Sequence, residues 1–141
     1  MTAFVDTSVL VAAFYGDHEH HAPSVALFVT LDKRSGCTAA HCLAEVYAVL
    51  TGMPGKDRVS PDEALLFLGD VRSRLSLIGL TSTEYIQAIN EAATNGVAGG
   101  GIHDALLSAS ARKAAARALY TWNVKHFTKH GAEIAALVRR P

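Results

Sequence analysis

Short apolar runs alternate along this chain with longer stretches in which apolar residues recur every three or four positions. The short runs predict buried strands at 2–5, 36–38, 76–80 and 118–121, and a fifth at 133–138. The periodic stretches predict helices at 9–14, from 23 onward, around 43–50, and at 60–74, 82–93 and 102–115. Elements that alternate at these lengths predict βαβ crossovers, and hence a mainly parallel sheet with helices on both faces.

Local sequence signals support two of these predicted helices. Ser60-Pro61-Asp62-Glu63 predicts a helix start, with a serine cap, a proline in the first turn and a glutamate that completes a capping box. The helix around 43–50 carries one apolar face at i, i+3, i+4 and i+7, made of Leu43, Val46, Tyr47 and Leu50. No repeat or linker divides the sequence, so we expect one domain over residues 1–141.

Composition narrows the class of protein. Half of the 141 residues are hydrophobic and 18% are charged, which is typical of a folded globular protein rather than a disordered one. The apolar runs are far shorter than a membrane span, and no basic segment precedes the first, so we expect neither a membrane helix nor a secretory signal. These features favour a cytoplasmic protein, in which Cys37 and Cys42 stay reduced.

Charge is balanced overall but divided along the chain. Residues 1–104 contain six Lys/Arg and twelve Asp/Glu, whereas residues 105–141 contain seven Lys/Arg and one Glu. The acids can collect a cation, and the bases can hold a polyanion. A solvated basic helix face accounts for the second part of the chain equally well.

Three acids lie at junctions between predicted elements. Asp6 follows the first strand directly, where open α/β sheets place their active sites. Glu45 faces away from the apolar side of its helix, and Asp104 lies in the first turn of a helix that three glycines precede. We expect the helix dipole to favour ionised Asp104, the form that binds a metal. The structural alternatives are a cap at Asp6, a solvated Glu45 and charge complementation at Asp104.

Four motifs, in their order along the chain, resemble those of PIN-domain ribonucleases, and in particular the VapC-type toxins of bacterial toxin–antitoxin pairs. They are Asp6-Thr7-Ser8-Val9-Leu10, Ala44-Glu45-Val46, His103-Asp104-Ala105-Leu106 and Thr121-Trp122-Asn123-Val124-Lys125-His126-Phe127. The resemblance spans nearly the whole chain. It implies a three-layer α/β/α sandwich and an endoribonuclease that depends on Mg²⁺ or Mn²⁺.

The resemblance also implies roles for the motif residues. Asp6 and Asp104 would be the principal metal ligands, and Glu45 would bind the metal directly, bind it through water, or help to activate the attacking water. Supporting hydrogen bonds would come from Thr7, Ser8 and Thr121. Small hard cations such as Mg²⁺ take oxygen ligands and usually keep several waters, which suits carboxylates of this kind.

Asn123 departs from the family pattern, because many PIN domains carry a fourth acid at this point. An amide adds no charge, so we expect Asn123 to position water or substrate rather than to act as an anionic ligand. Basic residues such as Arg112, Lys113, Lys125 and Lys129 would hold the RNA. The family further implies a homodimer and a small antitoxin, VapB-like, whose helix covers the groove.

Other functions stay open at this level. Asn123 favours a PIN fold that only binds RNA or protein, because the fourth acid is missing. A phosphotransfer enzyme with Asp6 as nucleophile has less support, since the DxD pattern of such enzymes is absent. The histidine-rich run Asp17-His18-Glu19-His20-His21 can bind a transition metal, although no distant cluster matches it.

Overall fold

A single parallel sheet forms the centre of the protein. The computed structural model describes residues 3–141, so Thr2 of the predicted first strand lies outside the described residues. The strands are β1 (Ala3–Val5), β2 (Gly36–Ala39), β3 (Ser76–Ile78), β4 (Ala118–Tyr120) and β5 (Val138–Arg139). They pair in the order β3-β2-β1-β4-β5, and each neighbouring pair is parallel. The predicted parallel sheet is confirmed.

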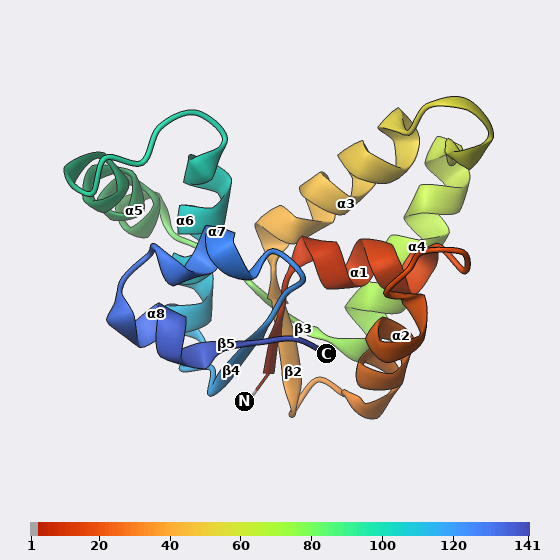
Figure 1. The fold of residues 1–141 in the computed structure, drawn as a ribbon, viewed down its shortest axis with the longest axis horizontal. Helices are drawn as coiled ribbons and strands as arrows, with labels where there is room; N and C mark the ends of the chain where they lie inside the picture. Colours follow the sequence, from red (N-terminus) through yellow and green to blue (C-terminus); the bar gives the residue numbers. More distant parts are fainter. Residues whose placement is uncertain (1–2) are drawn as a thin grey trace.

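Helices cover both faces of this sheet (Figure 1). They are α1 (Thr7–Phe14), α2 (His21–Thr30), α3 (Ala40–Gly52), α4 (Pro61–Arg74), α5 (Ser82–Thr94), α6 (Gly101–Lys113), α7 (Val124–Thr128) and α8 (Ala132–Leu137), with a 3₁₀ turn at Gly55–Asp57. The first four lie on one face and the last four on the other, which confirms the α/β/α sandwich. Among residues 3–141, no helix has the length and apolar character needed to cross a membrane.

The central strands are apolar because both of their faces are covered. Phe4, Val5 and Leu119 are fully buried, and Leu10 and Phe127 pack over them from opposite helical layers. Parallel strands covered on both sides read as continuous apolar runs, which is why β1 and β4 could be recognised from sequence. The strands all end at the same edge, and α1, α3 and α7 begin within a few residues of that edge.

The predicted strand at 133–138 is wrong. Residues Ala132–Leu137 form α8, and only Val138–Arg139 pair with β4. Ile134 is fully buried, so its apolar character was informative about burial. A six-residue run is too short to separate the period of a helix from that of a strand. The short helix α7 was not predicted either, because its motif carries no clear periodicity.

The buried face of α3 is rotated from the predicted one. Cys42, Val46 and Leu50 are fully buried, whereas Tyr47 is 36% exposed. The rotation follows from packing, because α3 contacts α1 and α4 together and these helices select the i, i+4, i+8 row. Glu45 therefore lies beside the buried face, half-buried, rather than opposite it.

Two helix starts show how side chains satisfy free backbone donors. Ser60 Oγ accepts a hydrogen bond from the backbone N–H of Glu63 at 3.2 Å, as predicted, but Glu63 Oε1 accepts the Ser60 hydroxyl. The complete capping box lies instead at Thr81 and Glu84, where each backbone N–H donates to the other side chain. Lys113 Nζ also donates to Glu84 Oε1 at 2.7 Å, which ties α6 to the start of α5.

Gly36 is a point where the core has no room for a side chain. A Cβ on this buried residue would lie 2.8 Å from Leu75 Cδ2 and 3.0 Å from Leu31 Cβ. We expect Gly36→Ala to lower the free energy of unfolding by about 1–3 kcal/mol through overpacking. Gly69→Ala is the matched control, since a Cβ at Gly69 in exposed α4 meets nothing within 4 Å. That control should gain up to about 1 kcal/mol from helix propensity. Equal effects in urea unfolding would contradict the account.

Glu84 should make stability depend on pH. The hydrogen bond from Lys113, followed by the backbone N–H of Thr81, lowers the pKa of Glu84 from 4.5 to about 2. Its contribution is therefore complete above 4.5 and is lost as pH falls toward 2. We expect Glu84→Gln to lower the melting temperature at pH 7, with a difference from wild type that shrinks on acidification. Glu91→Gln, a substitution of the same kind on the same helix, is the matched control.

Candidate active site

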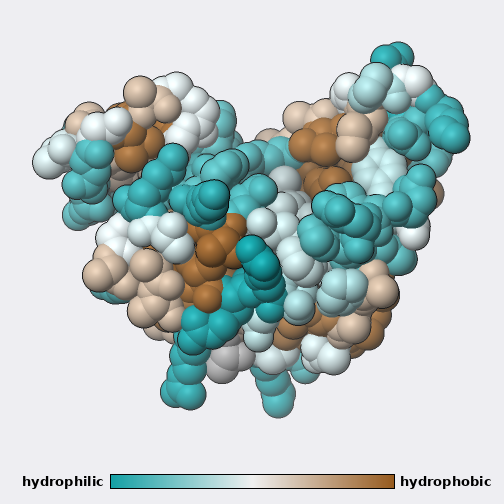
Figure 2. Space-filling model, in the orientation of Figure 1, coloured by the Kyte–Doolittle hydropathy of each residue, from teal (hydrophilic) through white to brown (hydrophobic). Residues whose placement is uncertain are grey.

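An open cavity of about 590 Å³ lies at the carboxyl edge of the sheet. Figure 2 shows the molecule hollowed between the raised arms that α3 and α6 form with their neighbours. Of the residues predicted to form the site, six line this cavity, namely Asp6, Thr7, Ser8, Glu45, Asp104 and Asn123. Thr121 lies underneath it and is fully buried. Segments far apart in the sequence therefore converge here.

Asp6 is a buried carboxylate held by side-chain hydroxyls. Its backbone N–H donates to the carbonyl of Tyr120 at 3.0 Å, so the β1–β4 ladder fixes the position of its Cα. It occupies the N-cap position of α1, where its side chain makes no capping hydrogen bond, although the backbone N–H groups of Ser8 and Thr7 still act to lower its pKa. Only 2% of Asp6 is exposed, and burial raises its pKa above the ordinary value, although hydrogen bonds from Thr121 and Ser8 oppose the shift. An ionised Asp6 is thus costly unless a cation neutralises it.

Two hydroxyls share one oxygen of this carboxylate. Thr121 Oγ1 and Ser8 Oγ each donate to Asp6 Oδ2 at 2.7 Å. Each hydroxyl carries one proton, so the 3.3 Å approach between Ser8 and Thr121 is a contact of two oxygens. These two hydroxyl oxygens also accept hydrogen bonds from the residues that follow β4. The backbone N–H of Asn123 donates to Thr121 Oγ1, and that of Trp122 donates to Ser8 Oγ. The network ties the ends of β1 and β4 together.

Glu45 faces Asp6 across the cavity from α3. Thr7 Oγ1 donates to Glu45 Oε1 at 3.1 Å, so the first residue of α1 orients this side chain. Burial, and then the charge of Asp6, raise the pKa of Glu45, while Thr7 and His103 oppose the shift. The solvated-glutamate alternative therefore does not describe this position.

Asp104 comes from the first turn of α6. Burial first, and then the charges of Asp6 and Glu45, raise its pKa, whereas His126 lowers it. Its place in the first turn of α6 lets the helix dipole favour the ionised form, whereas burial and the two nearby acids act in the opposite direction. His126 Nδ1 lies 3.5 Å from Asp104 Oδ2, an ion pair when the imidazole is protonated.

The four basic residues predicted to bind RNA fall into two pairs. Arg112 Nε bonds Glu133 at 2.7 Å, and Lys113 bonds Glu84, both near the far end of α6 from Asp104. Neither lines the acidic cavity. Lys125 lies on α7 and Lys129 directly after it, and the charge of Lys129 contributes to lowering the pKa of Asp104. Neither lysine is among the residues that line the cavity, although His126 of α7 is.

Several residues of the cavity wall were not predicted. His18, Glu19 and His20 form part of the rim, together with His103 and His126. His20 stacks on Trp122 with ring centroids 3.8 Å apart, and Trp122 Nε1 donates to Ser24, so packing occupies this tryptophan. His103 and His126 belong to motifs that the sequence analysis quotes, whereas the polar run at 17–21 did not indicate which element it would face.

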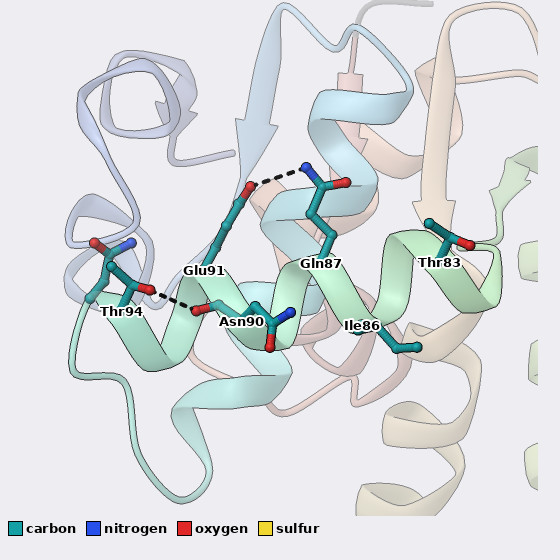
Figure 3. Close-up of a pocket in the computed structure, with 7 residues that line it drawn as sticks. Thr83, Ile86, Gln87, Asn90, Glu91 and Thr94 are labelled. Carbon is teal, nitrogen blue, oxygen red and sulfur yellow. Dashed lines mark hydrogen bonds between the residues drawn. The ribbon is translucent and has the colours of Figure 1, made fainter.

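A second concavity, on the outer side of α5, lacks comparable chemistry. Its side chains come from this helix and its C-cap residue Asn95, and Figure 3 labels Thr83, Ile86, Gln87 and Asn90 among them. Of its lining residues, one is titratable, Glu91. No convergence of charged groups from separate segments occurs there, so the acidic cavity is the candidate active site.

The three acids can serve a divalent cation as hard oxygen ligands that share one cavity. Their mutual repulsion shows in the raised pKa of Asp104, which the nearby Asp6 and Glu45 both increase. They are nevertheless not the tightest set of donors. Among the residues described, the trio whose donor atoms all lie within 4.8 Å of one another is His41, Glu45 and His103. Mg²⁺ commonly keeps several waters and takes one or two carboxylates directly, so wider spacing suits it.

Comparison with known proteins identifies the family of this chain. The sequence profile of the PIN domain matches residues 3–131. Ribonuclease VapC40 of Mycobacterium tuberculosis is 34% identical over 114 residues, which cover 81% of this chain and 81% of that protein.

Two solved structures share the fold. The crystal structure of Mycobacterium tuberculosis VapC20, a Sarcin-Ricin loop cleaving toxin, has a TM-score of 0.72 at 19% identity and covers 89% of this chain and 92% of that one. VapBC2 from Rickettsia felis, bound to a DNA fragment from its promoter, has a TM-score of 0.66 at 18% identity and covers 99% and 98%. With a matching profile over most of its length, this chain belongs to the PIN-domain family.

Proposed function

We propose that this chain is a divalent-metal-dependent endoribonuclease that acts as the toxin of a VapC-type toxin–antitoxin pair in the cytoplasm. The observation that carries the proposal is the convergence of Asp6, Glu45 and Asp104 on one open cavity at the carboxyl edge of the sheet. The identity of 34% to Ribonuclease VapC40 supports ribonuclease activity rather than binding alone. A small antitoxin and a second copy of the chain are its proposed protein partners.

Asp6 and Asp104 would hold the cation, Mg²⁺ or Mn²⁺, with Glu45 beside them. When bound, the ion would supply positive charge to the phosphodiester and make water more acidic. The hydroxyls of Ser8 and Thr121 keep Asp6 Oδ2 in place, so the ligand does not have to be ordered when the ion arrives.

The remaining residues of the cavity act on water and RNA. Thr7 engages Glu45 Oε1, which leaves Oε2 to accept a proton from the attacking water. Burial raises the pKa of Glu45, and a more basic carboxylate accepts a proton more readily. Asn123 would orient water or substrate through its amide. Lys125 and Lys129 are better placed than the paired Arg112 and Lys113 to hold the RNA backbone.

Loss of either principal acid should abolish cleavage. We expect Asp6→Asn and Asp104→Asn to reduce the rate of RNA cleavage in Mg²⁺ by about a hundredfold or more, since each removes an anionic ligand. Asp70→Asn, on the exposed side of α4, is the control and should cleave at the wild-type rate. Mapping of new RNA 5′ ends after brief expression measures this in cells. The proposal would be overturned if cells that express wild type and cells that express Asp104→Asn yielded the same RNA 5′ ends.

Thr121 allows the supporting network to be tested separately from the ligands. Thr121→Val removes the donor to Asp6 and the acceptor for the N–H of Asn123, whereas Thr121→Ser keeps both. We expect the valine variant to need about 10–100 times more Mg²⁺ for half-maximal cleavage and to lose about 1–3 kcal/mol of stability. The serine variant should stay near wild type. Equal Mg²⁺ requirements in the two variants would show that the hydroxyl is dispensable.

A further inference from the structure

A second set of metal-binding side chains lies at the edge of the acidic cavity. His41 and Glu45 are four residues apart on α3 and therefore lie on one face of the helix. His103, in the first turn of α6, meets them from the opposite wall. One donor atom from each of the three lies within 4.8 Å of the other two. Two secondary elements thus present two imidazoles and a carboxylate to one point.

The two imidazoles already direct a nitrogen at each other. His41 Nε2 and His103 Nδ1 are 2.9 Å apart, and the rings are nearly parallel, with an angle of 9° between their planes. At this distance, one shared proton must lie between the two lone pairs. A cation can replace that proton, because it too is bound where the lone pairs converge.

The spacing is close to what a tetrahedral ion needs. With Zn–N bonds of about 2.0–2.1 Å, two nitrogens on a tetrahedral ion lie roughly 3.3–3.4 Å apart. The observed 2.9 Å therefore has to open by about 0.4 Å. His103 is exposed and His41 is half-buried, so rotation of the side chains provides this opening without a shift of either helix.

The donor types select a different class of ion from the acidic site. Imidazole nitrogen suits Zn²⁺, Co²⁺ and Ni²⁺, whereas Mg²⁺ takes oxygen ligands. Two histidines and one glutamate form a common three-ligand set for zinc, with a fourth position left to water. The acids Asp6 and Asp104 add negative charge at the same cavity, which raises the local concentration of any divalent cation.

We propose that His41, Glu45 and His103 form a transition-metal site of the zinc class, which shares Glu45 with the neighbouring acidic site. An ion bound there would engage the carboxylate of Glu45 and take its charge and its proton-accepting oxygen away from the acidic site. This consequence for cleavage rests on the proposed function, whereas binding of the ion does not. Zinc would then oppose RNA cleavage supported by Mg²⁺.

Binding is tested on the full chain with the metals alone. Titration with Co²⁺ in excess Mg²⁺ should give the visible absorption of a tetrahedral nitrogen-ligated ion, and Zn²⁺ should abolish it by displacement. We expect His41→Gln and His103→Gln to weaken binding by about tenfold or more. His18→Gln is the matched control, since His18 lines the same cavity outside the trio. Unchanged binding in His41→Gln, or an equal loss in His18→Gln, would overturn the site.

Sharing of Glu45 is tested by cleavage at a fixed Mg²⁺ concentration. Each protein's cleavage rate with Zn²⁺ is compared with its own rate without Zn²⁺. Zn²⁺ should inhibit wild type at concentrations that leave the rate of His41→Gln unchanged. Zinc that binds without inhibiting would overturn the sharing of Glu45. A wild type that fails to cleave RNA in Mg²⁺ would instead overturn the proposed function, while the Co²⁺ spectrum still decides the site.

Discussion

The burial of one carboxylate at the end of the central strand governs this site. Asp6 is 2% exposed, and the hydroxyls of Ser8 and Thr121 donate to the same oxygen of its side chain. These two bonds only partly offset the loss of water, as the raised pKa of Asp6 shows. The fold therefore positions an acid that gains most when a cation arrives, and the stability of β1 and β4 keeps it in that position.

The sheet order explains why other acids meet Asp6. From β1 the chain first builds outward through β2 and β3, then returns to add β4 and β5 on the other side. Such a reversal leaves a crevice at the carboxyl ends of the strands, where α/β proteins bind their ligands. Glu45 enters it from α3, after β2, and Asp104 enters from α6, before β4. Two arms of the molecule rise on either side of this crevice (Figure 1).

Much of this arrangement could be predicted from the sequence, and the failures have physical causes. Asp6 could be predicted because it directly follows an apolar run that reads as a buried strand. Glu45 and Asp104 could be predicted because the family motifs occur in their usual order along the chain. The contact of His41 with His103 could not be predicted, since it joins residues 62 apart that only the packing of α3 near α6 brings together. The six-residue α8 was mistaken for a strand because burial alone does not fix its period.

A crystal grown in MnCl₂ and measured at the manganese absorption edge tests the central claim most directly. The account predicts an anomalous peak in the acidic cavity, bound by carboxylate oxygens of Asp6 and Asp104 at about 2.1 Å. Well-ordered Asp6 and Asp104 side chains at saturating Mn²⁺, with no anomalous peak on either of them, would contradict it.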